Sequence, residues 1–313
     1  MKLLEMTARV LADVLRARTD VVWLHDLDMV LVPALARRFL TRRSIRLVWD
    51  QHEYPASSML TNKGFAAWFR RSNAACDCVL HANAARRDAL VAWLGERRAE
   101  SHLVLENLPA RDFAGAPRQE LPQKVQAWLQ LRPFLVNFGG LQEVRRGREL
   151  VEAILRFRKA ALVVVGASDS ALCGALENVH GARFREWVYL QPSVPYAAVP
   201  AYLDSAAGSV ILYRADEINR KYCASNKLYE ALARGCPVLV GNNPPLQQAV
   251  NETGAGVVLE DDGESIDGIC AAMEKLLCQR HDLSAALLSG SPLVWETQER
   301  VLALAIGRSG GMD

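Results

Sequence analysis

The most constraining feature of this sequence is the regular alternation of short apolar runs with amphipathic segments of helical spacing. Beyond residue 130 the apolar runs have the length of strands and lie at 134–138, 161–165, 188–190, 209–213, 237–240 and 256–259. Runs that are apolar throughout are typical of strands in a parallel sheet that helices cover on both faces. Six such strands with crossover helices predict an α/β fold with a doubly wound, Rossmann-like sheet.

The first hundred residues show the same alternation with fewer strands. We expect strands at 21–24, 45–49, 78–80 and 101–105, and helices at 2–18, 30–40, 65–71 and 83–94. Four strands are fewer than a typical doubly wound domain contains, so this second Rossmann-like domain is expected to be incomplete. Either a preceding segment is missing, or the domain is a naturally short form whose cleft is open on one side.

The chain is long enough for two domains, because its 313 residues exceed the usual size of one. Residues 110–123 are rich in proline and polar residues, which is typical of a linker. We therefore divide the chain into an N-terminal domain (1–115), a C-terminal domain (124–290) and a last helical segment (291–313).

Charge and cysteine content restrict the partners and the compartment. The net charge of +2 gives no indication of a nucleic-acid partner. Arginine pairs in the first half, such as Arg42 and Arg43, are typical of solvated helix ends, and a basic face beside an anionic membrane is the alternative. The seven cysteines lack zinc-site spacing and the density of a disulfide scaffold. Without an apolar signal or spanning segment, these patterns predict a cytoplasmic protein, in solution or at the inner face of the membrane.

One stretch, residues 225–256, combines a helix, a buried strand and a second helix around a polar turn. Helical spacing places Leu228 and its apolar neighbours on one face of the first helix. It places Lys227, Glu230 and Arg234 on the opposite face. That polar face is a candidate ligand site, and a merely solvated surface is the alternative.

The same stretch has glycines where its two helices are expected to end. Gly235 follows the first helix and Gly254 the second, as residues that take a left-handed backbone after a helix commonly do. A polar turn, Gly-Asn-Asn-Pro at 241–244, leads from the strand into the second helix. Free N–H groups at a helix N-terminus attract anions, so this turn also predicts a place where an anion can bind.

Residues 226–240 resemble the donor-site signature of the GT-B glycosyltransferases, most closely that of glycosyltransferase family 4. They read Asn-Lys-Leu-Tyr-Glu-Ala-Leu-Ala-Arg-Gly-Cys-Pro-Val-Leu-Val. Further motifs agree in the same order along nearly the whole chain: Asp-Gln-His-Glu at 50–53, Glu-Asn-Leu-Pro at 106–109, Asn-Phe-Gly-Gly-Leu at 137–141, Arg-Gly at 146–147 and Trp-Glu at 295–296. The resemblance implies two Rossmann-like domains and a last helix that returns to the first.

The resemblance also implies an activity, that of a hexosyl- or related glycosyltransferase of glycan biosynthesis. Such an enzyme takes its sugar from a nucleotide-sugar donor, retains the anomeric configuration, and needs neither a metal nor a cofactor. The acceptor is a glycan, a lipid-linked sugar or a small molecule, which the sequence does not distinguish.

Site residues follow from the same resemblance. Glu230 would bind the ribose hydroxyls, Arg146 and Lys227 the diphosphate, and His52 the transferred sugar. The other expected donor contacts are Gly139, Gly140, Tyr222, Asn226 and Leu228. For Arg146 the alternative is an ordinary helix-end charge, and for His52 a loop histidine bonded only within the protein. Asp26 and Asp28 follow the first strand and are expected either to contact the acceptor or to cap the next helix.

Two positions depart from the family pattern. A glutamate is common eight residues before Glu230, where this chain has Tyr222, and an arginine is common at the position of Gly140. A non-catalytic GT-B protein that binds a nucleotide or a protein partner is therefore an alternative to a transferase. A sugar-nucleotide epimerase of the same fold is a third reading, although Lys-x-x-Glu at 227–230 fits family 4 better.

Overall fold

The computed structural model describes residues 2–16, 18–95, 99–289 and 292–307, which form two compact units. Unit 1 takes Met1–Asn107, Glu217–Ala224 and Glu296–Asp313, and unit 2 takes Leu108–Asp216 and Ser225–Trp295. The segment predicted as a linker, 110–123, thus belongs to unit 2, and the chain passes from unit 1 to unit 2 just before it. Among the described residues, every helix is too short or too polar to cross a lipid bilayer.

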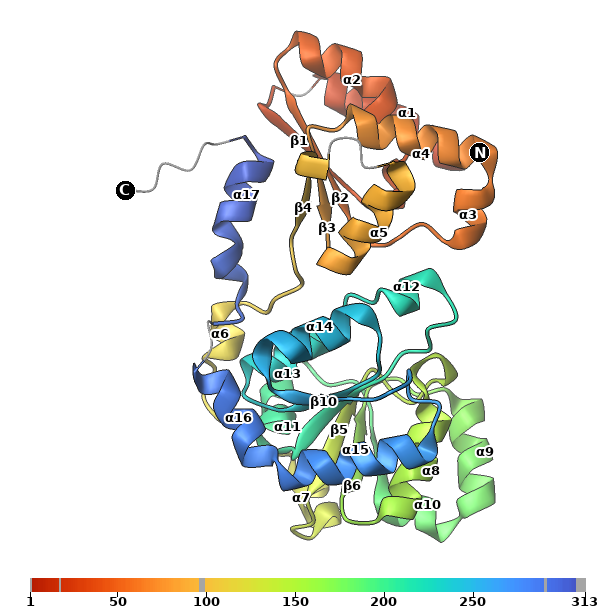
Figure 1. Cartoon of the computed structure of the whole chain (residues 1–313), viewed down its shortest axis with the longest axis vertical. Helices are drawn as coiled ribbons and strands as arrows, with labels where there is room; N and C mark the ends of the chain where they lie inside the picture. Colours follow the sequence, from red (N-terminus) through yellow and green to blue (C-terminus); the bar gives the residue numbers. More distant parts are fainter. Residues whose placement is uncertain (1, 17, 96–98, 290–291, 308–313) are drawn as a thin grey trace. The chain divides into compact units, whose positions relative to one another are not determined.

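Unit 1 is built on a parallel sheet of four strands. Its elements are α1 (Lys2–Arg16), β1 (Val21–His25), η1 (Leu27–Met29), α2 (Val32–Arg42), β2 (Arg46–Gln51), α3 (Ser57–Thr61), α4 (Lys63–Ala75), β3 (Cys78–His81), α5 (Ala84–Leu94), η2 (Ala99–Ser101), β4 (His102–Val104), α12 (Ile218–Lys221) and α17 (Glu299–Ala305). The strands lie in the order β1-β2-β3-β4 (Figure 1). The four strands predicted for this part of the chain are confirmed.

Helices cover both faces of this sheet. Successive strand residues point to opposite sides, so the apolar strands present side chains for packing on each face. Trp49 packs on one face against Phe69 of α4, within a cluster that α2 and α5 also join. Val48 and Leu80 point to the other face, where Ala305 of α17 packs against them. The last described helix therefore completes the core of unit 1, and α12, from between two elements of unit 2, adds Ile218 to the first cluster.

Unit 2 contains a parallel sheet of six strands in the order β10-β9-β8-β5-β6-β7. Its elements are α6 (Arg111–Ala114), α7 (Gln123–Leu129), β5 (Phe134–Phe138), η3 (Glu143–Arg145), α8 (Gly147–Phe157), β6 (Ala161–Val165), α9 (Ser170–His180), α10 (Ala182–Trp187), β7 (Val188–Gln191), η4 (Tyr196–Ala198), α11 (Val199–Ser205), β8 (Gly208–Ile211), α13 (Asn226–Ala233), β9 (Val238–Val240), α14 (Pro244–Thr253), β10 (Gly256–Val258), α15 (Ile266–Cys278) and α16 (Arg280–Ser289); η5 (Trp295–Gln298) begins at its last residue. The predicted α/β fold with Rossmann-like sheets is confirmed.

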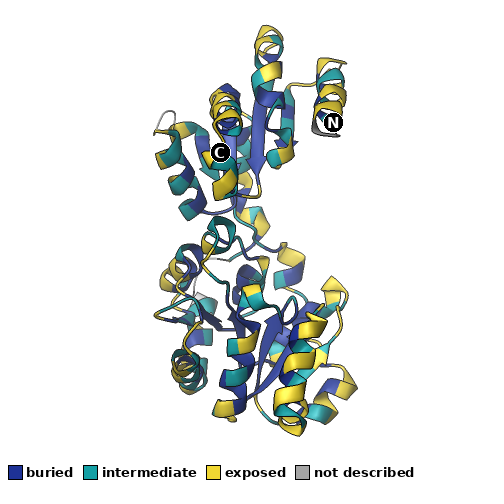
Figure 2. Ribbon diagram, turned by 90° about the vertical axis from the view of Figure 1, so that its right-hand side faces the viewer, coloured by how far each residue is buried: buried dark blue, intermediate teal, exposed yellow. Residues whose placement is uncertain are grey.

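The strand order of unit 2 fixes where a ligand can bind. The chain starts in the middle with β5, winds outward through β6 and β7, and returns to the other side of β5 with β8. Loops at the carboxyl ends of β5 and β8 therefore leave in opposite directions and open a crevice, which is where open α/β sheets bind ligands. Figure 2 shows the strands of this sheet buried and the outer faces of its helices exposed.

The helix ends predicted in the 225–256 stretch are confirmed. Gly235 has φ 71° and Gly254 has φ 64°, the left-handed backbone that glycine takes without strain. Gly254 is the residue that ends α14. The seven cysteines of the chain are thiols rather than disulfides.

Arg234 differs from the expectation that it shares a solvent or ligand face with Lys227 and Glu230. Its side chain is only 5% exposed, and its guanidinium donates to both carboxylate oxygens of Asp204 at 2.9 and 2.5 Å. The same guanidinium donates to the carbonyls of Phe113, Ala114 and Ala116. Helical spacing misplaces Arg234 because α13 ends at the residue before it, so its side chain turns toward the segment around α6.

Replacing Arg234 with methionine is expected to lower the free energy of unfolding of unit 2 by about 3–5 kcal/mol, because Asp204 then keeps a buried charge without its partner. Urea unfolding followed by circular dichroism measures this. The control is Arg156→Met, which removes an ion pair with Asp267 whose side chains are 63% and 76% exposed, and which should change stability by less than about 1 kcal/mol. Equal effects of the two substitutions would contradict the structural role given to Arg234.

Candidate functional site

A loop of two glycines follows β5 at the crevice of unit 2. Gly139 has φ 92° and Gly140 has φ 79°, values that residues other than glycine rarely adopt. A Cβ at Gly140 would lie 1.9 Å from the carbonyl oxygen of Ala167, in the loop after β6. Only glycine therefore lets the two loops approach so closely. A recess of about 520 Å³ beside them is lined by Gln142, Glu143, Val144, Ala167, Ser168 and Asp169.

Two cations lie against this loop. A Cβ at Gly139 would be 1.9 Å from a guanidinium nitrogen of Arg145 and 2.5 Å from the Nζ of Lys227. Both charged groups therefore lie next to Gly139, on the side where a Cβ would stand. Arg145 donates to the carbonyl oxygen of Gly139, and its guanidinium lies 5.9 Å from the centre of the Tyr213 ring, just beyond β8. Lys227 comes from the first turn of α13. Together with the backbone of the loop, these cations form a suitable site for a doubly charged anion such as a diphosphate.

Arg146 has other partners. Its backbone is left-handed, with φ 53°. The guanidinium is buried, and it donates to Glu149 at 2.9 Å and to Asp262. Burial disfavours the charged guanidinium and so lowers the pKa of Arg146. The hydrogen bonds to Glu149 and Asp262 have the larger effect, and the pKa of Arg146 is raised. Arg146 thus joins the start of α8 to the loop after β10.

Glu230 lies one turn beyond Lys227 on α13. Its carboxylate accepts a hydrogen bond from the phenol of Tyr196, a residue that is 54% exposed and stacks on Phe113 with ring centres 4.9 Å apart. Burial raises the pKa of Glu230, although the Tyr196 phenol and the charge of Lys227 oppose the rise. Burial and the nearby Glu230 carboxylate raise the pKa of Tyr196 to about 12. The carboxylate is therefore an acceptor already matched to a hydroxyl donor.

The remaining predicted donor residues divide between the two units. Asn226 is exposed at the start of α13, whereas the Leu228 side chain is buried in the core and packs away from solvent. Tyr222 belongs to unit 1, where its ring lies 6.3 Å from that of Tyr54 and its carbonyl oxygen accepts a hydrogen bond from Arg86. Gly139, Gly140, Lys227 and Glu230 thus belong to unit 2, and Tyr222 belongs to unit 1.

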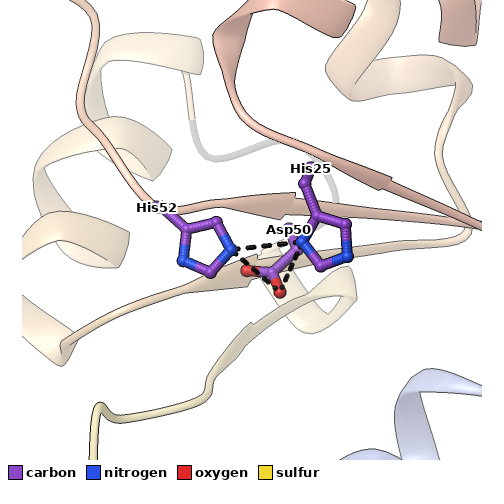
Figure 3. Close-up of side chains that lie close together, drawn as sticks. All are labelled: His25, Asp50 and His52. Atoms are coloured by element: carbon purple, nitrogen blue, oxygen red, sulfur yellow. Dashed lines mark hydrogen bonds and ion pairs between the residues drawn. The ribbon is translucent and has the colours of Figure 1, made fainter.

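His52 is part of a different cluster, in unit 1. In the register of the sheet, His25 at the end of β1 pairs with Asp50 of β2, and His52 follows two residues later on the same side. Figure 3 shows both rings turned toward the carboxylate of Asp50. The Nδ1 of His25 and the Nε2 of His52 are 3.1 Å apart, and each is 3.5 Å from the Oδ2 of Asp50. Burial raises the pKa of Asp50, and the two histidines and a hydrogen bond from Trp23 oppose this rise.

The loop after β1 borders the same cluster. A pocket of about 410 Å³ is lined by Asp26, Leu27, Asp28, His52 and Glu53. Asp26 precedes η1, but its side chain makes no capping hydrogen bond to that helix. Its backbone has φ 63°, a strained value for a residue other than glycine. The capping role considered for Asp26 is therefore not seen in the structure.

Sequence reasoning assigned no role to Arg145, Tyr196, His25 or Asp50, although Asp50 begins the motif at 50–53. A signal existed for three of them, because Arg145 is adjacent to Arg146, and His25 and Asp50 follow neighbouring apolar strands. No readable signal pointed to Tyr196, which comes from a short loop helix, η4, far from α13 in the sequence.

Known proteins match this chain in two respects, the sequence of its C-terminal half and its fold. Residues 132–279, which lie in unit 2, match the family model described as glycosyl transferases group 1. No curated protein gives a significant sequence match.

Solved structures match nearly the entire chain. A trehalose-6-phosphate synthase studied for glycosyltransfer with retention has a TM-score of 0.71 at 13% identity, over 97% of this chain and 78% of that chain. A UDP-forming α,α-trehalose-phosphate synthase from Burkholderia xenovorans gives 0.73 at 11%, over 99% and 79%. Anabaena Alr3699/HepE in complex with UDP gives 0.72 at 14%, over 96% and 82%. The predicted GT-B fold is thereby confirmed.

The raised pKa of Glu230 predicts a pH-dependent stability difference. Because the folded pKa lies above the ordinary value of 4.5, the native carboxyl holds a proton that the unfolded chain has already lost. The free energy of unfolding therefore falls as pH rises through the folded pKa. The variant Glu230→Gln has no such titration, so it should melt at a higher temperature than the wild type at pH 7.5, and the difference should close below pH 4.5. A difference independent of pH in differential scanning fluorimetry would count against this environment for Glu230.

Proposed function

We propose, from the glycosyl transferases group 1 match at residues 132–279, that this chain is a glycosyltransferase whose nucleotide-sugar donor binds in unit 2. One observation carries the proposal: Arg145 and Lys227 converge on the glycine loop at the point where the strand order reverses, and Glu230 lies one turn beyond Lys227 on α13. That is the place and the chemistry that a ribose followed by a diphosphate requires.

Each side chain has a role in this proposal. Glu230 accepts hydrogen bonds from the ribose hydroxyls, which take the place of the Tyr196 phenol, and such charge-assisted bonds contribute about 1.5–3 kcal/mol. Arg145 and Lys227 bind the diphosphate. The same cations stabilise the charge that develops on the nucleoside diphosphate as it leaves, so they favour the transition state as well as the bound donor.

The finer features of the reaction are part of the same proposal. Transfer proceeds with retention, which is also the outcome studied for the structurally similar trehalose-6-phosphate synthase. The charge of Arg145 and Lys227 serves at the diphosphate in place of a metal ion. UDP is the first nucleotide to test, because two of the similar proteins are described as UDP-forming or in complex with UDP. The acceptor is a glycan, a lipid-linked sugar or a small molecule.

A second candidate is a GT-B protein that binds a nucleotide without transferring a sugar. It is favoured by Tyr222, which replaces a glutamate of the family pattern and belongs to unit 1. The two candidates differ in turnover. Release of UDP from UDP-glucose by the purified chain, with water or an added acceptor, supports a transferase; binding of UDP without any release from a panel of nucleotide sugars supports the second candidate.

We expect Glu230→Ala to weaken the binding of both UDP and uridine by about 10- to 100-fold, because both ligands carry the ribose. Lys227→Ala and Arg145→Ala should weaken the binding of UDP by a similar factor and leave the binding of uridine unchanged, because uridine has no phosphate. Isothermal titration calorimetry measures all three.

The matched control is Arg148→Ala. Arg148 is 47% exposed and pairs with Glu143 at 2.8 Å, close in sequence to the loop but not against Gly139. It should bind UDP like the wild type. Wild-type affinity in the Glu230→Ala variant would sink the assignment of the ribose site.

A further inference from the structure

The cluster in unit 1 brings three donor atoms to one point. We propose that His25, Asp50 and His52 bind a divalent transition-metal ion of the zinc class. The atoms are the Nδ1 of His25, the Nε2 of His52 and the Oδ2 of Asp50 (Figure 3). Within the ranges that the structure describes, this is the one group of three or more His, Cys, Asp or Glu side chains whose donor atoms are close enough to hold a metal.

The hydrogen bonding of these three atoms depends on which ring nitrogen carries the proton. A hydrogen bond across the 3.1 Å between the two rings needs one nitrogen with a proton and one without. The nitrogen without a proton accepts that hydrogen bond, and the Oδ2 of Asp50 accepts one from the indole of Trp23. A cation at the centre would instead receive a lone pair from each of the three atoms, because all three lie within 3.5 Å of one another.

The spacing fits zinc. Zinc bonds histidine nitrogen and carboxylate oxygen at about 2.0–2.2 Å in tetrahedral geometry, which separates the ligand atoms by about 3.3–3.5 Å. The observed separations of 3.1, 3.5 and 3.5 Å lie around that range. Two histidines with one carboxylate are also a common zinc ligand set.

The fold holds the ligands in place before any ion arrives. The parallel pairing of β1 and β2 fixes His25 beside Asp50, and the backbone N–H of Asp26 donates to the carbonyl oxygen of Asp50 at 2.9 Å. Trp23 donates from its indole to the Oδ2 of Asp50 at 3.3 Å. Such supporting contacts orient metal ligands and tune their affinity. The strained backbone of Asp26 is maintained at the edge of this cluster, which is where functional strain is usually found.

One coordination position remains open to solvent. Asp50 is only 8% exposed, but the side chains of His25 and His52 are 58% and 47% exposed. Three protein ligands on one side of a tetrahedral ion leave the fourth position for water or for an oxygen of a bound molecule. His52 also lines the 410 Å³ pocket, where Asp26, Asp28 and Glu53 add negative charge that favours a cation.

This inference goes beyond the proposed function, because the ion lies in unit 1 and the donor residues lie in unit 2. It gives His52 the role of a metal ligand in place of the sugar contact that the resemblance implies. The ligand class for the open position is a carboxylate oxygen or a hydroxyl, and a bound zinc ion makes the hydroxyl proton easier to remove.

The test uses the full chain after treatment with a chelator. Titration with Zn²⁺ against a chromophoric competitor should show one ion bound per chain, with a dissociation constant in the micromolar range or tighter. Co²⁺ in place of Zn²⁺ should give the intense visible absorption of a tetrahedral site. In the variant His25→Ala, the visible absorption of bound Co²⁺ should be lost. The zinc affinity should fall by about 100-fold or more, which is a larger loss than removal of a supporting contact causes.

The matched control is His180→Ala, which removes a histidine that pairs with Glu152 at 2.8 Å in unit 2. It should bind both metals like the wild type. Absence of stoichiometric metal binding by the wild type overturns the proposal, as does metal binding that His25→Ala and His180→Ala leave equally unchanged. An unchanged melting temperature of metal-free His25→Ala confirms that the variant is folded. UDP calorimetry on metal-free protein tests the donor site separately.

Discussion

The close approach of two loops at the carboxyl edge of the unit 2 sheet is the constraint on which the candidate donor site depends. Gly140 meets the Ala167 backbone with no room for a side chain, and Gly139 leaves a space that Arg145 and Lys227 share. A Cβ on either glycine would displace the neighbouring loop or the cations. The strand order places β5 between β6, whose loop supplies Ala167, and β8, which precedes α13 with Lys227, so the position of the charges follows from the topology as well as from local sequence.

Much of the fold was readable because its determinants are local. Apolar runs gave the strands of both parallel sheets, and Gly235 and Gly254 gave the ends of two helices, since each pattern reports burial or backbone conformation directly. Arg234 shows the limit of such reasoning. Helical spacing says which side of α13 a residue faces, but not that the helix ends one residue earlier and that a buried carboxylate, Asp204, lies nearby.

The candidate site was readable only in part, because contacts between distant segments decide it. Lys227 and Glu230 follow from one helix, whereas the contacts of Arg145 with Gly139 and of Arg146 with Asp262 are set by the tertiary structure. Tyr196 reaches Glu230 through tertiary packing on Phe113. The cluster of His25, Asp50 and His52 likewise requires the register of β1 against β2, which the separate motifs do not contain.

The central claim, that Glu230 holds the ribose and Arg145 with Lys227 holds the diphosphate, is tested most directly by a crystal structure of the chain with UDP. The account predicts both ribose hydroxyls within about 3.2 Å of the Glu230 carboxylate, the Tyr196 phenol displaced from it, and phosphate oxygens against Gly139 between the two cations. A nucleotide bound elsewhere, or one bound in unit 2 with the Tyr196–Glu230 hydrogen bond intact, would contradict it.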